Sequence, residues 1–223
     1  MSDTVRYTAA HFDAHYAVPD PWKVERTLPR DKVMRKVLPQ YVTGRSVLEL
    51  GCGEGFHAAT ILRNAAHITG VDLSPVAIVR ATERRLPNAT FLVDDFLNVS
   101  LSGYDVITAI ECLNYLSKED RERFLEKVAR EHSGKTFVFS NPIIGSNEHG
   151  TYFTHAGVVE MFGRHDISII EAHNLNTYRI SPSANWAVAS LAAALVRLLP
   201  GGYLLLPWLP EKLIYQRLYV GRC

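Results

Sequence analysis

The sequence predicts an α/β fold with a mainly parallel sheet, and three observations support this. Between residues 46 and 141, apolar segments alternate with segments of helical periodicity, a pattern typical of βαβ units with right-handed crossovers. These apolar segments are continuous runs rich in Val, Ile and Leu, as expected for strands that are buried on both faces. With 223 residues, the chain is long enough for one sizeable core and marginal for two.

The predicted elements follow in order along the chain. A first helix is expected to begin near Pro29, because proline is tolerated in a first turn, and to end near Gly44, with Val33, Val37 and Leu38 on its buried face. The elements after it are a strand at 46–50, a helix at 56–65, a strand at 67–73, a helix at 74–86, strands at 89–95 and 104–113, a helix at 117–132 and a strand at 134–141.

Short polar side chains mark three helix starts. Ser74, Ser117 and Thr154 each precede a helical segment and are expected to cap it, since a side-chain oxygen there can accept from a free backbone N–H. Beyond residue 141 the predicted elements are a helix at 154–163, a strand-like segment at 165–175 and a last strand at 211–222.

Composition excludes several classes of protein. Apolar residues make up 47% and charged residues 21% of the chain, as in an ordinary globular domain. The net charge of +1, without a long basic run, does not favour nucleic acid as a partner. Three cysteines without a CxxC or Cys/His spacing favour a reducing cytosol and predict no metal site. The N-terminus lacks the apolar stretch of a signal peptide, so we expect a cytoplasmic protein.

The stretch "VLELGCGEGF" joins a buried strand to three glycines, Gly51, Gly53 and Gly55, and then to a helix that opens at Phe56. Ligands of open α/β sheets bind beyond the carboxyl ends of the strands. Glycines let the turn bend sharply and let a ligand approach bare backbone, and free N–H groups of the helix would point into the same crevice. Glu49, at the strand end, could accept hydrogen bonds or orient a cation. The alternative is a turn that merely links strand to helix.

Acidic residues follow the next two strands. Asp72 lies 21 residues beyond Gly51, where a carboxylate can grip two ribose hydroxyls. Asp94 and Asp95 end the third strand and could contact an adenine edge. The alternatives are a turn-forming acid at Asp72 and a solvated loop at the other two. A dinucleotide fingerprint requires G-x-G-x-x-G, but Phe56 stands at the third position. A ligand with a ribose, an adenine and a small zwitterionic tail therefore fits better than one with phosphates.

Four motifs together resemble the class I S-adenosylmethionine-dependent methyltransferases. They are "VLELGCGEG", "GVDLSPVAI", "LVDDF" and "YDVITAIECLNYL", in order and at the family's spacing, over residues 44–141. The resemblance implies that Asp72 is the ribose acid, that Asp95 and Phe96 flank the adenine, and that Glu111 lies just past the fourth strand. It also implies a three-layer Rossmann-like fold. Its seven-stranded sheet would be mostly parallel with an antiparallel last strand, and helices would cover both faces.

A second motif is shorter. The stretch "HFDAHYAVPDPW" is similar to the start of the nodulation-type N-methyltransferases, in which the N-terminal segment helps to cover the cofactor. This resemblance adds Trp22 and Arg30 as candidates, although Trp22 could instead be an aromatic plug in the N-terminal packing. The predicted S-adenosylmethionine site comprises Trp22, Arg30, Glu49, Gly51, Cys52, Gly53, Gly55, Asp72, Leu73, Asp94, Asp95, Phe96 and Glu111.

The chain is expected to form a single methyltransferase domain, 1–223. Its expected parts are an N-terminal cap over the cofactor site at 1–43 and a cofactor-binding core at 44–141. A substrate-side half at 142–223 would follow, with an apolar insertion at 176–210.

Candidate catalytic residues follow the fourth and fifth strands. Glu111, Tyr115 and His149 would lie at the mouth of the site. His149 could act as a base near neutral pH or simply be solvated. His11 and Tyr16 could reach the same mouth if the N-terminal segment folds over it.

An apolar stretch at 184–210 carries leucines at helical spacing up to Pro200. Its helix is shorter than the roughly 20 residues that a membrane span needs. Three interpretations remain open: it packs on the sheet or forms a homodimer face, it is a lid over an apolar substrate pocket, or it dips into a membrane surface.

The leading hypothesis for function is methyl transfer to an N or O atom of a small molecule, such as a sugar, an amino sugar or an apolar metabolite. The alternatives are a methyltransferase-like protein that binds the ligand without catalysis, and an NAD-dependent reductase, which the glycine spacing disfavours. RNA methylation is a weaker option, because the composition gives no basic face and no "NPPY" follows the fourth strand.

Overall fold

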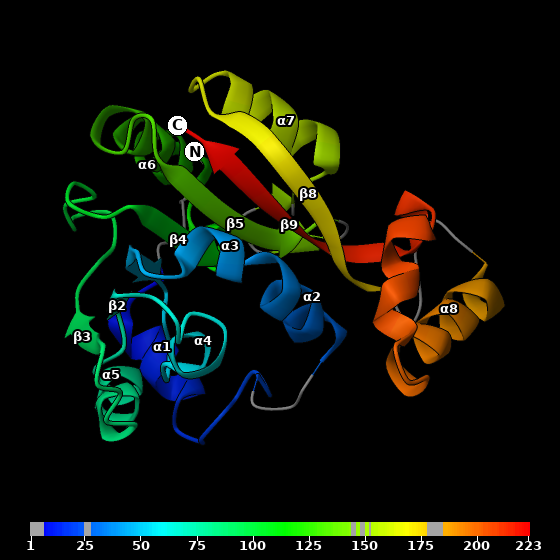
Figure 1. The fold of residues 1–223 in the computed structure, drawn as a ribbon, viewed down its shortest axis with the longest axis horizontal. Helices are drawn as coiled ribbons and strands as arrows, with labels where there is room; N and C mark the ends of the chain where they lie inside the picture. The colour runs from blue at the N-terminus through cyan, green and yellow to red at the C-terminus, as the bar shows by residue number, and fades with distance from the viewer. Residues whose placement is uncertain (1–6, 25–27, 144–145, 148–149, 152, 178–184) are drawn as a thin grey trace.

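A seven-stranded sheet forms the centre of the molecule (Figure 1), in the strand order β3-β2-β1-β4-β5-β9-β8. The computed structural model describes residues 7–24, 28–143, 146–147, 150–151, 153–177 and 185–223. The first five strands pair in parallel, and β9 runs antiparallel to both β5 and β8. The predicted fold class is therefore confirmed. The strands are β1 Ser46–Leu50, β2 His67–Asp72, β3 Ala89–Val93, β4 Val106–Ile110, β5 Thr136–Pro142, β8 Ser168–Thr177 and β9 Ile214–Arg222, with a separate hairpin of β6 Ser146–Asn147 and β7 Gly150–Thr151.

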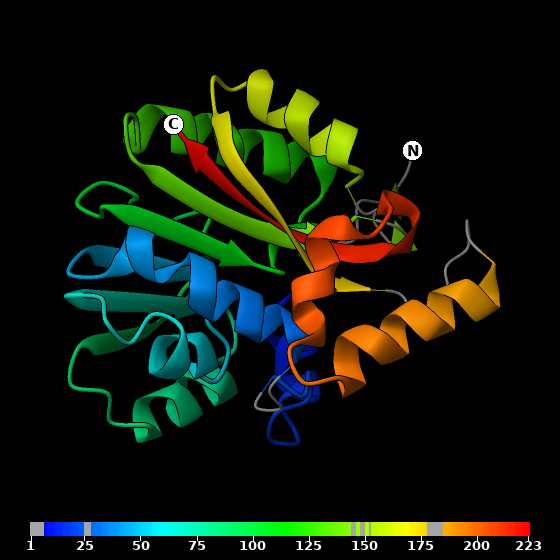
Figure 2. The ribbon, with the colours of Figure 1, turned by 45° about the vertical axis from the view of Figure 1, so that its right-hand side comes forward.

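Helices cover both faces of this sheet (Figures 1 and 2). Side chains of α2, α3 and α4 share one buried cluster with the strands, while side chains of α6 and α7 share the other. The short helix α1 lies beyond the carboxyl ends of the strands, and α8 lies to the side of the sheet. The helices are α1 Ala9–His15, α2 Pro29–Val37, α3 Pro39–Val42, α4 Phe56–Thr60, α5 Pro75–Glu83, α6 Lys118–Glu131, α7 His155–Gly163 and α8 Trp186–Leu198.

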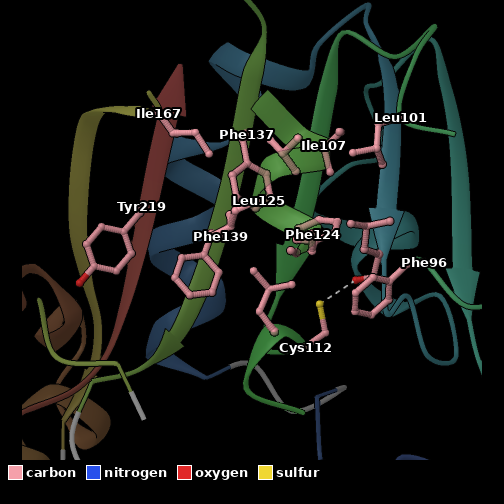
Figure 3. Close-up of a cluster of buried hydrophobic side chains, with 14 of the residues drawn as sticks. Phe96, Leu101, Ile107, Cys112, Phe124, Leu125, Phe137, Phe139, Ile167 and Tyr219 are labelled. Carbon is pink, nitrogen blue, oxygen red and sulfur yellow. Dashed lines mark hydrogen bonds between the residues drawn. The ribbon is translucent and has the colours of Figure 1, made fainter. Parts of the chain in front are cut away.

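An aromatic row fills the layer between the sheet and helices α6 and α7 (Figure 3). Phe137 contacts Phe124 and Phe139 at centroid distances of 6.1 and 6.5 Å. Cys112 and Phe96 lie at one end of this cluster, where the Cys112 thiol donates to the carbonyl of Leu50 at 3.3 Å. The core thus continues up to the carboxyl ends of the strands and supports the loops that follow them.

The predicted caps are confirmed at three helix starts. The hydroxyls of Ser74, Ser117 and Thr154 accept from the backbone N–H three residues further on, at 3.1, 3.0 and 3.0 Å. These bonds satisfy donors that the first helical turn leaves free.

Two predicted helices are shorter than expected. The helix that begins at Pro29 ends at Val37, and Pro39 opens the separate α3, because proline lacks the N–H that would continue the first helix. The helix expected over 56–65 ends at Thr60. The residues after it instead bond to the turn before β1, where the Gly44 N–H donates to the Asn64 carbonyl at 2.9 Å. Helix α4 does begin at Phe56, as the sequence predicts, with Gly55 as its N-cap.

The apolar stretch near the C-terminus forms α8, then η2 (Gly202–Trp208) and η3 (Glu211–Leu213). Helix α8 packs on η2 and on the end of β8, and it projects from the body of the molecule (Figure 2). In the part of the chain that the structure describes, no helix is long and apolar enough to cross a bilayer.

Candidate active site

A cavity of about 250 Å³ lies at the carboxyl ends of β1 to β4, between these strand ends and the N-terminal segment. The loops that follow these four strands each contribute to its walls, and the segment around α1 closes it on the opposite side. Its walls are formed by Tyr7, Phe12, Tyr16, Asp20, Pro21, Trp22, Val24, Arg30, Gly51, Cys52, Gly53, Glu54, Phe56, His57, Asp72, Leu73, Asp95, Phe96, Leu97, Ile110, Glu111, Cys112, Tyr115, Leu116, Ser117 and Asp120.

The turn after β1 requires glycine at two positions. Gly51 has φ +66°, and a Cβ built there would lie 2.7 Å from the Cβ of Cys112. Gly53 has φ +52°, and its Cβ would lie 2.7 Å from the hydroxyl oxygen of Tyr16. Both φ values lie in the left-handed region that favours glycine. The turn can therefore approach β4 on one side and the N-terminal segment on the other.

Asp72 fixes this turn to the end of β2. One carboxylate oxygen accepts from the Gly53 N–H and the other from the Ser74 N–H, both at 2.9 Å. Burial raises the pKa of the Asp72 carboxyl above its usual range, and the two backbone hydrogen bonds oppose that shift. Because a carboxylate has about four lone-pair sites, Asp72 keeps acceptor capacity on the side of the cavity.

Arg30 and Glu111 form an ion pair across the cavity wall. An Arg30 Nη1 atom lies 2.6 Å from Glu111 Oε1, and Arg30 Nε lies 3.4 Å from Asp31. Glu111 has φ +58°, a strained conformation for a non-glycine residue that often marks a functional site. Arg30 is buried, and its Nη2 has no hydrogen-bond partner among the described residues.

Glu54 ties the N-terminal segment to the glycine turn. Its carboxylate accepts from the Asp20 N–H at 2.9 Å and pairs with Arg80 of α5 at 2.5 Å. A second tie joins α1 to the start of α5, where the Ser74 hydroxyl donates to Asp13 at 2.5 Å. These contacts hold the segment before α2 against the carboxyl ends of β1 and β2.

Aromatic rings line the outer side of the cavity. Tyr115 packs edge-on against Tyr7 and Phe12, each at a centroid distance of 5.4 Å, and lies 6.4 Å from Trp22. Tyr16 is buried behind them, and desolvation together with nearby Asp72 raises the pKa of its hydroxyl well above the ordinary value. The rings limit the access of water to the glycine turn.

Most of the predicted site residues meet in this cavity, namely Trp22, Arg30, Gly51, Cys52, Gly53, Asp72, Leu73, Asp95, Phe96, Glu111 and Tyr115.

Three predicted cofactor residues do not line the cavity. Glu49 is buried beneath the turn, with an oxygen 3.3 Å from His57 Nδ1. Gly55 faces away, towards the ring of Phe91. Asp94 is exposed, and its carboxylate accepts from the next backbone N–H at 2.7 Å.

His149, the predicted base, lies outside the described residues.

Sequence reasoning missed Glu54 and the aromatic residues Tyr7 and Phe12. The acid inside the "GCGEGF" turn was visible in the sequence, but its partners lie on two other segments. The aromatic residues come from a segment without clear periodicity. Tyr16 does line the cavity, whereas His11 is not among its wall residues.

Comparisons with known proteins agree with this geometry. Residues 47–131 match a family described as a methyltransferase domain. This part of the chain is thus similar to methyltransferase domains. The resemblance to the class I S-adenosylmethionine-dependent methyltransferases is thereby confirmed for its central part.

Two curated methyltransferases are similar in sequence to part of this chain. The chain is 33% identical over 111 residues to a magnesium-protoporphyrin O-methyltransferase of Rhodobacter capsulatus, covering 48% of this chain and 50% of that protein. It is 30% identical over 148 residues to a ubiquinone biosynthesis O-methyltransferase of Coxiella burnetii, covering 60% and 61%. The chain thus spans about half the length of the curated relatives it matches.

A solved structure shows the same fold. The N-methyltransferase NodS of Bradyrhizobium japonicum, in complex with S-adenosylhomocysteine, superposes with a TM-score of 0.67 over 96% of this chain and 97% of that one, at 17% identity. The chain therefore shares its overall fold with that protein.

Proposed function

We propose that the cavity binds S-adenosylmethionine and that the protein transfers its methyl group to an N or O atom of a small molecule. The observation that carries this proposal is the charge of the walls. Among the described residues that line the cavity, Arg30 carries the one guanidinium and six residues carry a carboxyl group, namely Asp20, Glu54, Asp72, Asp95, Glu111 and Asp120. Two of these acids are paired, Glu111 with Arg30 and Glu54 with Arg80 of α5, so the walls keep an excess of negative charge. A cleft lined mainly by one sign of charge attracts ligands of the opposite sign. These walls suit a sulfonium cation and oppose a pyrophosphate, which disfavours an NAD-dependent reductase.

The residues present also fit the other parts of this cofactor. Asp72 has acceptor capacity for two ribose hydroxyls. Phe96 and Asp95 lie beside each other in the wall and offer an apolar face and an acceptor for an adenine. The Arg30 guanidinium in the cavity wall suits the carboxylate of the aminoacyl tail, and Glu111 beside it suits the ammonium group. Each group of the zwitterionic ligand thus has a partner of complementary charge.

The cofactor, when bound, supplies an already activated methyl group, so the protein mainly has to hold the acceptor in line. The aromatic rings of Tyr7, Phe12 and Tyr115 exclude water from that line. The Glu111 carboxylate, held by Arg30 at 2.6 Å, can orient an acceptor N–H or O–H and accept its proton. His149 remains a candidate base for acceptors that arrive protonated.

The acceptor is a small molecule in this proposal, and a sugar, an amino sugar or an apolar metabolite would each fit. Of the two relatives, one is named a magnesium-protoporphyrin O-methyltransferase and the other a ubiquinone biosynthesis O-methyltransferase. An apolar ring system would suit the aromatic wall best. The alternative is a binding protein that holds the cofactor without catalysis.

Paired aspartate variants test the site. Asp72→Asn should weaken S-adenosylhomocysteine binding by about 1.5–3 kcal/mol, as expected for lost hydrogen bonds to a charged group, measured by titration calorimetry. Asp94→Asn is the matched control, because Asp94 is a neighbouring acid outside the cavity wall, and it should bind like the wild type. Equal loss in both variants would contradict the assignment of the cavity.

Mass spectrometry then separates an enzyme from a binding protein. Wild-type protein with S-adenosylmethionine and panels of amino sugars, phenols and lipid-like acceptors should yield a product heavier by one methylene, and Asp72→Asn should yield less. Tight binding without any product across all three panels would favour the binding protein.

A further inference from the structure

Large apolar side chains cover the outer surface of α8 and η2. The residues are individually exposed, up to 79% for Leu198 and 85% for Trp208. We call this set the α8–η2 surface, and it comprises Val188, Leu191, Leu195, Leu198, Leu199, Leu204, Leu205 and Trp208.

Helix α8 differs from an ordinary surface helix in the side chains that it buries and exposes. Its buried side carries Ala189, Ala192, Ala193 and Val196, so mainly small side chains face the protein while the leucines face outward. A surface helix normally buries its large apolar residues and exposes its polar ones. Within 186–198 the only charged residue is Arg197. An apolar surface of this kind marks a place where something else covers the protein.

Lysines border this surface on one side. Lys32 and Lys36 are exposed on α2 and are four residues apart, so they lie on the same face of that helix. The Lys32 ammonium lies 5.7 Å from the ring centroid of Tyr203 in η2, and Lys36 lines a shallow pocket together with Tyr203 and Leu204. The apolar surface and the positive charges are therefore adjacent.

The acid that lines the same pocket as Lys36 is paired. Glu211, which begins η3, lies 3.2 Å from Arg217. The surface thus combines exposed leucines, an exposed tryptophan at its edge and a positive border. Leucine and tryptophan insert into the boundary between headgroups and acyl chains, and lysines beside them attract anionic lipids.

We propose that the α8–η2 surface docks the protein on a membrane that contains anionic lipid. The described helices are too short to span a bilayer, so the helix lies on the membrane. A symmetric contact between two copies of this chain through the same surface is the alternative that the experiment below separates.

The docking surface and the candidate site are linked through one helix. Helix α2 joins the two, because it carries Arg30 in the cavity wall at its start and Lys36, beside η2, near its end. A protein docked in this way would meet acceptors that partition into the bilayer. The docking itself does not depend on the proposed methyl transfer.

Vesicle sedimentation tests the proposal. Full-length protein should sediment with vesicles of phosphatidylcholine and phosphatidylglycerol, and much less with phosphatidylcholine alone. The variant Lys32→Gln/Lys36→Gln should lose about 30-fold in affinity for the anionic vesicles, from about 1 kcal/mol per lysine, and change little on neutral ones. Leu198→Glu/Trp208→Glu should abolish sedimentation with both.

The matched control is Val159→Glu on α7, an apolar residue that is 48% exposed elsewhere, and it should bind like the wild type. Because all the substituted side chains are exposed, melting temperatures should stay near the wild-type value in every variant. Absence of wild-type sedimentation would overturn the proposal. So would a concentration-dependent dimer that Leu198→Glu/Trp208→Glu abolishes while vesicle binding is unchanged.

Discussion

The replacement Gly51→Ala should destabilise the fold for two separable reasons. The left-handed φ of +66° costs about 1–2 kcal/mol for a residue with a Cβ. The new methyl group would lie 2.7 Å from Cys112 Cβ, and overpacking of this kind costs about 1–3 kcal/mol. Alanine also lowers the conformational entropy of the unfolded chain, and this offsets about 0.4–1 kcal/mol of the lost stability. We expect a net loss of about 2–4 kcal/mol in the free energy of unfolding.

Two further variants separate these contributions. Gly44→Ala has a similar φ of +70° and meets nothing within 4 Å, so it should lose only about 1 kcal/mol. Gly70→Ala has no positive φ, but its Cβ would meet Phe91 at 2.6 Å, and it should lose about 1–3 kcal/mol. Urea unfolding followed by circular dichroism measures all three. A Gly51→Ala variant no less stable than Gly44→Ala would refute the close approach of the turn to β4.

Three other predictions concern charge and protonation. Arg30→Gln should weaken S-adenosylhomocysteine binding about tenfold or more in calorimetry, since hydrogen bonds to charged groups contribute about 1.5–3 kcal/mol, whereas the exposed Arg35→Gln should not. His132 is fully buried and burial lowers its pKa below 6.5, so its neutral form favours the folded state. This contribution to stability is complete above pH 6.5 and is lost as the pH falls towards the lowered pKa of the folded state. The urea concentration at the unfolding midpoint should therefore decrease as the pH is lowered below 6.5, and it should decrease less steeply in His132→Gln. Burial raises the pKa of the Cys52 and Cys112 thiols, and it raises the pKa of Cys223 to about 12. Because the thiolate is the form that reacts, iodoacetamide at neutral pH should label the folded protein slowly and the unfolded protein fast. Mass spectrometry of the labelled protein measures this difference.

The parts of the fold that depend on local signals could be predicted from the sequence. The glycine turn, the caps at Ser74 and Ser117 and the alternation of strands and helices each depend on residues within a few positions of one another. The antiparallel pairing of β9 with β5 and β8 came instead from the resemblance to a known family, because a strand's neighbours are set by distant segments.

Helix α1 shows why other parts could not be predicted. No residue between Ala9 and His15 is buried, so the segment has no apolar face to produce helical periodicity. The helix is held by the Thr8 cap and by Asp13, which accepts from Ser74 on another segment. A sequence pattern cannot report a contact of that kind.

Helix α8 shows a different limit. Its helical spacing was visible, but periodicity alone does not say which face is buried. In the structure, the face of α8 with the small side chains is buried and the leucines are exposed. Prediction of the site from sequence is limited in the same way. Glu49 and Asp94 both follow the motif spacing, but Glu49 is buried beneath the turn and Asp94 lies outside the cavity wall.

Calorimetric titration of ligand-stripped protein with S-adenosylhomocysteine, and separately with NADH, tests the central claim most directly. The acid-lined cavity predicts saturable binding of S-adenosylhomocysteine at one site and no heat from NADH. Binding of NADH, or no uptake of S-adenosylhomocysteine by folded protein, would contradict the assignment of this cavity.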